Sequence, residues 1–357
     1  MHGSHGSRRL GVLLLAMTMF VVAASDAAFA KKKGKKKGPV EDPYAEYVWP
    51  APPDKARIKL EDVIVGRADV EARTKWRRKL LGASPQAVYD TLKKPFAVAF
   101  DPQGRILVTD SGNAALIRFD RNGERMDVLG TQGTVRLKLP LGLTVTADGT
   151  IYVADAALLK VVAYDAEGKV VAVYGKAGEL TNPTDAAVSP DGKRLFVADS
   201  KTHSIVVFDL ETAEHVTSFG VRGKEAGQLH FPTSLVFGPE GNLFVVDQMN
   251  SRIQLFDPDN EFLDQFGALG IGYGNFVRPK DVAVDELGLI YVTDNAFNNV
   301  QLFDTDFSLL TFVGEGGGGP GQFHGASGIA VQGDRLAVVD QLGKRLQVFR
   351  FLVPKLE

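Results

Sequence analysis

A unit of roughly 46 residues recurs six times between Pro95 and the C-terminus, and this recurrence constrains the fold more than any single motif. Each unit contains an apolar run that ends in aspartate, and a second apolar stretch closes ten residues later. The recurrent aspartates are Asp110, Asp155, Asp199, Asp247, Asp294 and Asp340. Units built only from short strands cannot bury both of their faces, so each must stack on its neighbours. The repeat therefore favours a closed, all-β ring of blades over an open solenoid.

The two ends of the repeat region predict how the ring closes. Each unit is predicted to contain four strands, but the last unit stops after its third strand, near Leu352. The other fourth strands end in glycine, and residues 57–66, upstream of the first unit, end in the same way at Gly66. We therefore expect residues 57–66 to complete the sixth blade by pairing with the C-terminal strand. Such closure removes exposed sheet edges, and deletion of residues 57–66 is expected to open the ring.

The units resemble NHL repeats. The resemblance is carried by residues 232–257, which read PTSLVFGPEGNLFVVDQMNSRIQLFD, and by the linking pieces at Phe266-Gly267, Gly227 and Gly321. It extends over about residues 95–352 and recurs in register six times. The resemblance implies a six-bladed β-propeller of the NHL type, similar to exported bacterial NHL-repeat proteins.

The N-terminus has the features of an export signal. Arg8 and Arg9 precede an apolar stretch over residues 10–24, and Ala28-Phe29-Ala30 has the small-x-small pattern of a cleavage site. We predict that residues 1–30 are a signal peptide and that the mature protein is periplasmic or extracellular. The general secretory and twin-arginine routes both stay open, as does an uncleaved N-terminal anchor. No second candidate span follows in the mature chain, since spanning a bilayer takes roughly 20 apolar residues.

Residues 31–56 are predicted to be a basic and proline-rich linker. The tract from Lys31 to Lys37 contains six lysines. About 1 kcal/mol per lysine near an anionic surface would give weak, salt-sensitive contact with such surfaces. The alternative is a solvated tail. The net charge of −2 argues against general polyanion binding, and the lack of cysteine excludes disulfides, thiolate metal sites and a cysteine nucleophile.

Residues 67–94 form a longer segment than the other connections between units. Residues 68–81 and 86–92 within it are compatible with short helices. We expect this insert on or beside the face that carries the channel mouth, either as a structural cap or as a partner-binding element. Trp76 lies among basic residues, an arrangement that would suit an acidic protein partner.

Some first strands carry charged residues at positions expected to face the channel. The third position of the motif is Asp185 in the third unit and Asp281 in the fifth, with Lys280 beside the latter. Two carboxylates near a channel mouth could hold a cation or contact a polar ligand. The alternative is a solvated polar lining. The recurrent aspartates, by contrast, are expected to accept hydrogen bonds from turn backbone in every blade.

The histidine positions bear on a zinc site. One NHL-like branch is a lyase that releases amidated peptides and holds zinc with three channel-facing histidines. Here His230 and His324 share one position of the repeat, but no third histidine occupies it. His203 is expected farther from the axis and His215 on the opposite face. A catalytic zinc needs three convergent protein ligands, so these positions predict no metal site, no cofactor and no catalytic set.

Calcium and single-stranded RNA are two further possible ligands. Lactone-hydrolysing propellers bind calcium with a Glu, an Asn and an Asp, and no glutamate occupies a first-strand position here. A divalent cation in the channel stays an alternative. Arg252 and Arg345 share one turn position and could contribute to a basic face, because some NHL propellers bind single-stranded RNA. Export argues against nucleic acid as a partner.

These observations favour a non-enzymatic propeller that acts as a protein-binding or scaffolding module in the cell envelope. The alternatives are a channel-centred, metal-dependent lyase or hydrolase resembling the peptide-amidating lyases, and a propeller that binds a small ligand. Fold alone does not choose between them.

Overall fold

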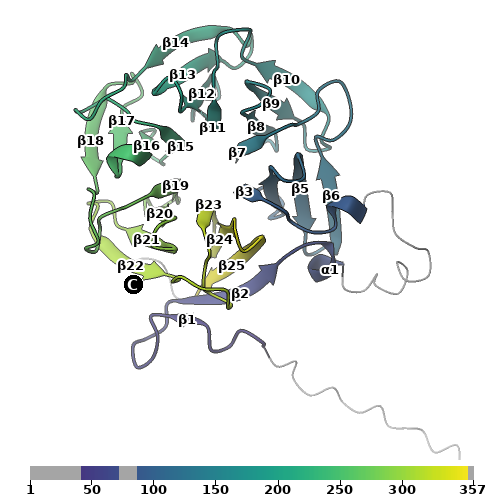
Figure 1. Cartoon of the computed structure of the whole chain (residues 1–357), viewed down its shortest axis with the longest axis vertical. Coiled ribbons are helices and arrows are strands. Elements are labelled where there is room, and N and C mark those ends of the chain that lie inside the picture. The colour runs from purple at the N-terminus through teal and green to yellow at the C-terminus, as the bar shows by residue number, and fades with distance from the viewer. Residues whose placement is uncertain (1–41, 72–86, 353–357) are drawn as a thin grey trace, which may run out of the picture. The chain divides into compact units, whose positions relative to one another are not determined.

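The computed structural model describes residues 42–71 and 87–352, and within them six β-sheets surround a central axis (Figure 1). Five sheets contain four strands each and the sixth contains five. Every strand pairing is antiparallel, and the blades follow one another round the ring in chain order (Figure 1). The predicted all-β, six-bladed propeller is confirmed.

The strands of each blade run outward from the axis in chain order. In blades one to three they are β3 (Pro95–Phe100), β4 (Ile106–Asp110), β5 (Ala115–Asp120), β6 (Arg125–Leu129), β7 (Pro140–Val145), β8 (Ile151–Asp155), β9 (Lys160–Tyr164), β10 (Val170–Tyr174), β11 (Pro183–Val188), β12 (Arg194–Asp199), β13 (Ser204–Asp209) and β14 (His215–Phe219).

Blades four to six repeat this order, except that two strands from upstream of the repeats complete the last blade. The strands are β15 (Pro232–Phe237), β16 (Leu243–Asp247), β17 (Arg252–Phe256), β18 (Phe262–Phe266), β19 (Pro279–Val284), β20 (Ile290–Asp294), β21 (Asn299–Phe303), β22 (Leu309–Val313), β23 (Ala326–Gln332), β24 (Arg335–Asp340), β25 (Arg345–Phe351), β2 (Ile58–Ile64) and β1 (Val48–Trp49).

The second strand of each blade is covered on both faces by neighbouring blades. All five residues of β4 are buried, and so are all five of β16. This double coverage explains why these strands are nearly continuous apolar runs instead of alternating patterns. The core therefore lies between blades, and one cluster joins Val108 and Ile117 of blade one to Ala337 and Leu346 of blade six.

Blade six is assembled from both ends of the chain. Strand β2 pairs antiparallel with β25, with Leu60 opposite Phe349 and Ile64 opposite Leu346. Both Leu60 and Leu346 are fully buried. This is the pairing expected for residues 57–66, and it leaves β25 hydrogen-bonded on both sides.

The proline-rich segment is not wholly a linker, which corrects the predicted domain boundary. Strand β1 adds a fifth strand to blade six, with Trp49 opposite Ile58. The Trp49 ring packs edge-on against Phe349 at 5.4 Å between ring centroids, and it fills the space beside Gly321, where a Cβ would collide with it. The sequence did not predict this strand, because it is only two residues long and shows no alternating pattern, and because the prolines beside it suggested a linker. The predicted signal peptide and the tract from Lys31 to Lys37 lie outside the described residues.

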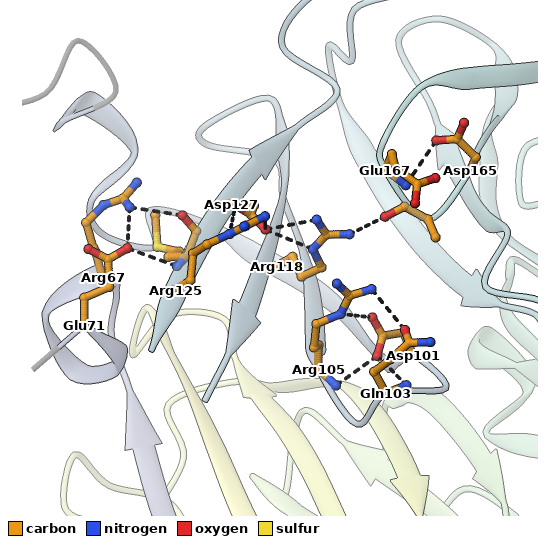
Figure 2. A network of polar contacts seen from close by, with 12 residues as sticks. Arg67, Glu71, Asp101, Gln103, Arg105, Arg118, Arg125, Asp127, Asp165 and Glu167 are labelled. Atoms are coloured by element: carbon orange, nitrogen blue, oxygen red, sulfur yellow. Dashed lines mark hydrogen bonds and ion pairs between the residues drawn. The ribbon is translucent and has the colours of Figure 1, made fainter. Parts of the chain in front are cut away.

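Where the structure describes it, the insert begins at the outer edge of blade one, although it was expected on or beside the face with the channel mouth. Its helical parts among the described residues are α1 (Arg67–Val70) and the 3₁₀ turn η2 (Ala87–Tyr89). Figure 1 places α1 next to the outer strand of blade one, and Figure 2 shows Arg67 and Glu71 there. Residues 72–86, with Trp76, lie outside the described part. No helix within it is long and apolar enough to cross a membrane.

The insert covers the open edge of blade one with side chains. Arg67 Nη1 donates a hydrogen bond to the Met126 carbonyl oxygen, and Glu71 Oε1 accepts one from the Met126 N–H, each at 3.0 Å. Met126 belongs to β6, whose outer edge no other strand covers. Satisfying an edge strand in this way blocks the addition of a foreign strand at that residue.

Hydroxyl groups tie neighbouring blades together around the axis. Thr109 donates to the carbonyl oxygen of Leu141 in the next blade, and Thr293 donates to that of Ser327. Ser327 in turn donates to the Phe96 carbonyl, which links the last blade to the first. These bonds link blade one to blade two, blade five to blade six and blade six to blade one beside the channel.

We predict that Trp49→Ala destabilises the propeller by about 2 kcal/mol, because it removes a partly buried aromatic ring from the closing blade. Urea unfolding measures the change. Val171→Ala, at an outer-strand valine that is 55% exposed, serves as a control and should cost much less. Equal stability of Trp49→Ala and the wild-type protein would show that β1 does not contribute to closure.

Candidate functional site

The six recurrent aspartates hold the loops of the upper face, the face on which the interblade loops emerge. All six are fully buried. Asp110 is typical: its carboxylate accepts from the Lys93 N–H at 2.7 Å in the interblade loop and from the Gly112 N–H at 2.9 Å in the adjacent turn. Their predicted role as acceptors for backbone is confirmed. A side chain that is repeated in every blade with these partners is structural.

Arg252 and Arg345 belong to the same supporting layer, which corrects their assignment to a basic binding face. Arg252 Nε donates to Asp247 at 2.8 Å, and Arg345 Nε donates to Asp340 at 2.9 Å. Arg252 is 6% exposed and also donates to the carbonyl oxygens of Glu225 and Gln228. Both guanidinium groups are therefore occupied with aspartates and loop carbonyls. The basic surface expected from these two residues does not form.

The histidines are placed differently from the prediction. His230 and His324 do share one position, since their N–H groups donate to Asp247 and Asp340 respectively. His203, which was expected farther from the axis, lies against His230 with 5.3 Å between ring centroids. Its backbone is left-handed at φ 59°, and this turn conformation brings the ring to the interblade loop.

The His203 ring has a defined tautomer. The Phe231 N–H donates to His203 Nδ1 at 3.1 Å, so the proton of the neutral imidazole is on Nε2. Burial, with the nearby His230 and Arg222, lowers the pKa of His203. In residues 42–71 and 87–352, no three His, Cys, Asp or Glu side chains gather in a group that could hold a metal ion.

The innermost strands of all six blades line a central cavity of about 300 Å³. The predicted residues Asp185, Asp281 and Lys280 all line it, so the structure brings these three together. Asp281 accepts from the Ser234 hydroxyl at 2.5 Å and from the Ile329 N–H at 2.8 Å. Asp185 accepts from the Leu235 N–H at 3.1 Å. The two carboxylates thus bond to the first strands of neighbouring blades.

The opposite wall of the cavity is built from small residues. Gly142 and Gly328 occupy the strand position that carries Asp185 and Asp281 in other blades. A Cβ at Gly142 would collide with the Asp185 carboxylate, and one at Gly328 would collide with the backbone of Ala97. Glycine is required at both positions because adjacent first strands approach each other closely there. The charged wall consequently comes from blades three to five alone.

The charges in the cavity are strongly perturbed. Burial raises the pKa of Asp185 well above its usual range, and the charge of Asp281 adds to that effect. Burial also raises the pKa of Asp281, to about 6. Burial lowers the pKa of Lys280 to about 8, and its Nζ lies 4.6 Å from the centroid of the Phe96 ring. Clusters of perturbed groups in a cavity are typical of functional sites.

A second distinctive surface, which the sequence analysis missed, lies on the rim between blades four and five. We call it the rim patch. It comprises exposed apolar side chains from the loop after β18 and from β22, namely Leu269, Ile271, Tyr273, Leu310 and Phe312. Ile271 is 90% exposed and Tyr273 is 82% exposed. Tyr273 stacks on Phe312 with 5.7 Å between ring centroids.

The rim patch continues into a groove. Phe312 also lines a groove of about 430 Å³ together with Tyr47, Trp49 and Pro320. A signal for this surface was present in the sequence. The corresponding loops contain Arg222, Lys224 and Glu225 in one blade and Glu315 with a run of glycines in another, whereas this loop alternates Leu, Ile and Tyr with glycine. Contiguous exposed apolar surface of this kind marks interaction sites.

Comparisons with known proteins agree with the fold. A family model described as NHL repeat matches residues 180–208. A virginiamycin B lyase from Staphylococcus aureus is 13% identical with a TM-score of 0.55, covering 76% of this chain and 83% of that one. A gluconolactonase from Xanthomonas campestris is 18% identical with a TM-score of 0.58, covering 74% and 88%. Hydrazine synthase from Kuenenia stuttgartiensis is 16% identical with a TM-score of 0.53, covering 74% and 97%. At these identities the likeness is one of fold.

We predict that replacing one channel carboxylate makes stability less dependent on pH. Because the folded-state pKa values of Asp185 and Asp281 are raised, the folded protein binds more protons than the unfolded chain. The pair therefore contributes stability at low pH that is lost as pH rises from about 4 through 6. Asp185→Asn removes part of this loss. Relative to wild type, its free energy of unfolding should increase between pH 5 and pH 8.

Urea unfolding at the two pH values measures this difference. Asp259→Asn, at an exposed turn, is the control and should follow the wild-type dependence. If Asp185→Asn changed the free energy of unfolding by the same amount at both pH values, burial would not raise the pKa of Asp185 in the folded protein.

Proposed function

Because the chain is a six-bladed propeller that carries an NHL repeat, we propose that it is a non-enzymatic protein-binding module that acts in the cell envelope. In this proposal the N-terminal segment directs export. The tract from Lys31 to Lys37 then adds weak contact with anionic surfaces. The propeller supplies a rigid frame that presents its loops and rim to a protein partner. The proposal requires no cofactor.

The observation that carries the proposal is the rim patch. Burying a large apolar side chain is worth about 1.5–3 kcal/mol relative to leaving it in water, so exposing Leu269, Ile271 and Tyr273 together has a cost that a partner would remove. Tyrosine is also one of the residues enriched in the energetic centres of protein interfaces. If this part of the rim only faced solvent, polar side chains would connect the two blades without that cost.

The surroundings of the rim patch indicate the chemistry of the partner. The adjoining groove presents aromatic rings from Tyr47, Trp49 and Phe312, and the exposed Glu46 and Glu315 border it. In the part of the chain that the structure describes, the outer edge of β22 also has no pairing strand. We expect the partner to offer an extended apolar segment with basic flanking residues, which would bury its side chains in the groove and pair its charges with the glutamates.

We predict that Ile271→Ser combined with Tyr273→Ser abolishes partner capture. The mature protein would be cross-linked in envelope extracts, and captured proteins would be quantified by mass spectrometry. The double variant should lose the dominant partner by at least tenfold because it loses the central apolar contacts. Val171→Ser changes an exposed valine on blade two and should retain the partner. Identical capture by all three proteins would overturn the proposal.

Catalysis by a metal in the channel is the alternative, and the metal content distinguishes it. A catalytic zinc needs three convergent ligands, whereas among the histidines of the described residues His203 and His230 are neighbours and His324 belongs to another blade. We expect elemental analysis of protein purified without chelators to give no stoichiometric zinc or calcium. One bound ion per chain would contradict a non-enzymatic role and favour the lyase or hydrolase.

A further inference from the structure

We propose that the central cavity binds a small zwitterion with an apolar tail, of the chemical class of the apolar α-amino acids. This site is separate from the rim patch, because it is lined by the first strands of the blades instead of the outer strand and loop. It therefore stands or falls independently of the protein-binding function.

Lys280 provides the group that would bind the carboxylate. It is the one cation at the second position of the first strands, where the other blades carry Phe96, Leu141, Thr184, Thr233 and Ser327. Its Nζ lies over the Phe96 ring, and in the described part of the chain no carboxylate hydrogen-bonds to it. The neighbouring Asp281 offsets part of the cost of burying this ammonium group, and a ligand carboxylate hydrogen-bonded to it would offset more.

Asp185 and Asp281 provide the group that would bind the ammonium. An ionised carboxylate has about four acceptor positions, and the bonds to Ser234, Leu235 and Ile329 leave part of that capacity unused. The two side chains come from blades three and five and meet at Ser234 of blade four, so they approach one point of the cavity from two sides. A ligand ammonium group there would stabilise the ionised form of both carboxylates, whose pKa values burial raises.

The deeper part of the cavity is apolar. Beyond the charged level, the first strands contribute small and branched apolar residues to the lining, among them Ala99, Val145, Val236, Val284 and Val331. A ligand whose charged ends lie near Lys280 and the aspartates would direct its side chain along these residues. The volume of about 300 Å³ is at the lower end of ligand cavities, which limits the ligand to a small molecule.

The arrangement of charges distinguishes a zwitterion from a simple ion. A simple anion at Lys280 would lie beside two carboxylates that repel it. A simple amine at the aspartates would place a second cation beside Lys280, whose ammonium group already interacts with Asp281. A molecule with a carboxylate next to an ammonium group satisfies both sets of residues at once, and it adds no net charge to the buried cavity.

The test uses isothermal titration calorimetry of the full chain with L-leucine and with its two half-analogues, isocaproate and isoamylamine. We expect saturable binding of one L-leucine per chain, and at least tenfold weaker binding of each half-analogue. Lys280→Met and Asp281→Asn should each weaken L-leucine binding at least tenfold. Lys193→Met, in the exposed turn between β11 and β12, should leave it within twofold of wild type.

Circular dichroism and the thermal midpoint establish whether each variant is folded, and Lys280→Met is the decisive one because its side chain makes no hydrogen bond to the scaffold among the described residues. Three results would overturn the proposal. They are no binding of L-leucine to the wild-type protein, binding of a half-analogue as tight as that of L-leucine, and undiminished binding of L-leucine to folded Lys280→Met.

Discussion

The pairing of β2 with β25 is the constraint on which the rest of the structure depends. The second and third strands of each blade are buried between the two neighbouring blades. Every blade therefore needs two neighbours, and only a closed ring provides them. Closure joins an early segment of the domain to its last strand, and the core residues of blade six, such as Leu60 and Phe349, are buried by this pairing. Trp49 extends the same sheet by one more strand and packs on Phe349 from outside.

Once the ring is closed, the repeated residues hold its shape and the departures from the repeat create its distinctive surfaces. The buried aspartates bind interblade loops in the same way in all six blades, and Arg252 and Arg345 reinforce two of them. Lys280 and the aspartates at 185 and 281 break the neutral pattern of the first strands. The rim patch breaks the polar pattern of the interblade loops.

The fold could be predicted from the sequence because the same strand pattern recurs six times, and such units can bury their faces only against one another. The incomplete last unit identified the closing strand. Position within the repeat also placed Asp185 and Asp281 together at the channel. Other features depend on which side chain occupies a repeated position. The turn residue four positions after the recurrent aspartate is left-handed in every blade, but only in blade three is it a histidine, His203, whose ring lies against His230. The spacing of five residues from Asp247 to Arg252 buries an arginine that was expected at a basic face. The loop of the rim patch is visibly apolar in the sequence, but it was missed because such a loop occurs in only one blade.

Hydrogen exchange of the β25 amides tests the closed ring most directly. The N–H groups of Val348 and Arg350 face β2, because N–H groups alternate along a strand and the Leu352 N–H donates to Arg57. If β2 pairs with β25, these amides should exchange as slowly as those of the third strand β13 in blade three, only through opening of the whole ring. Exchange of the β25 amides at the faster rates of an outer strand such as β14 would contradict closure by the N-terminal strand.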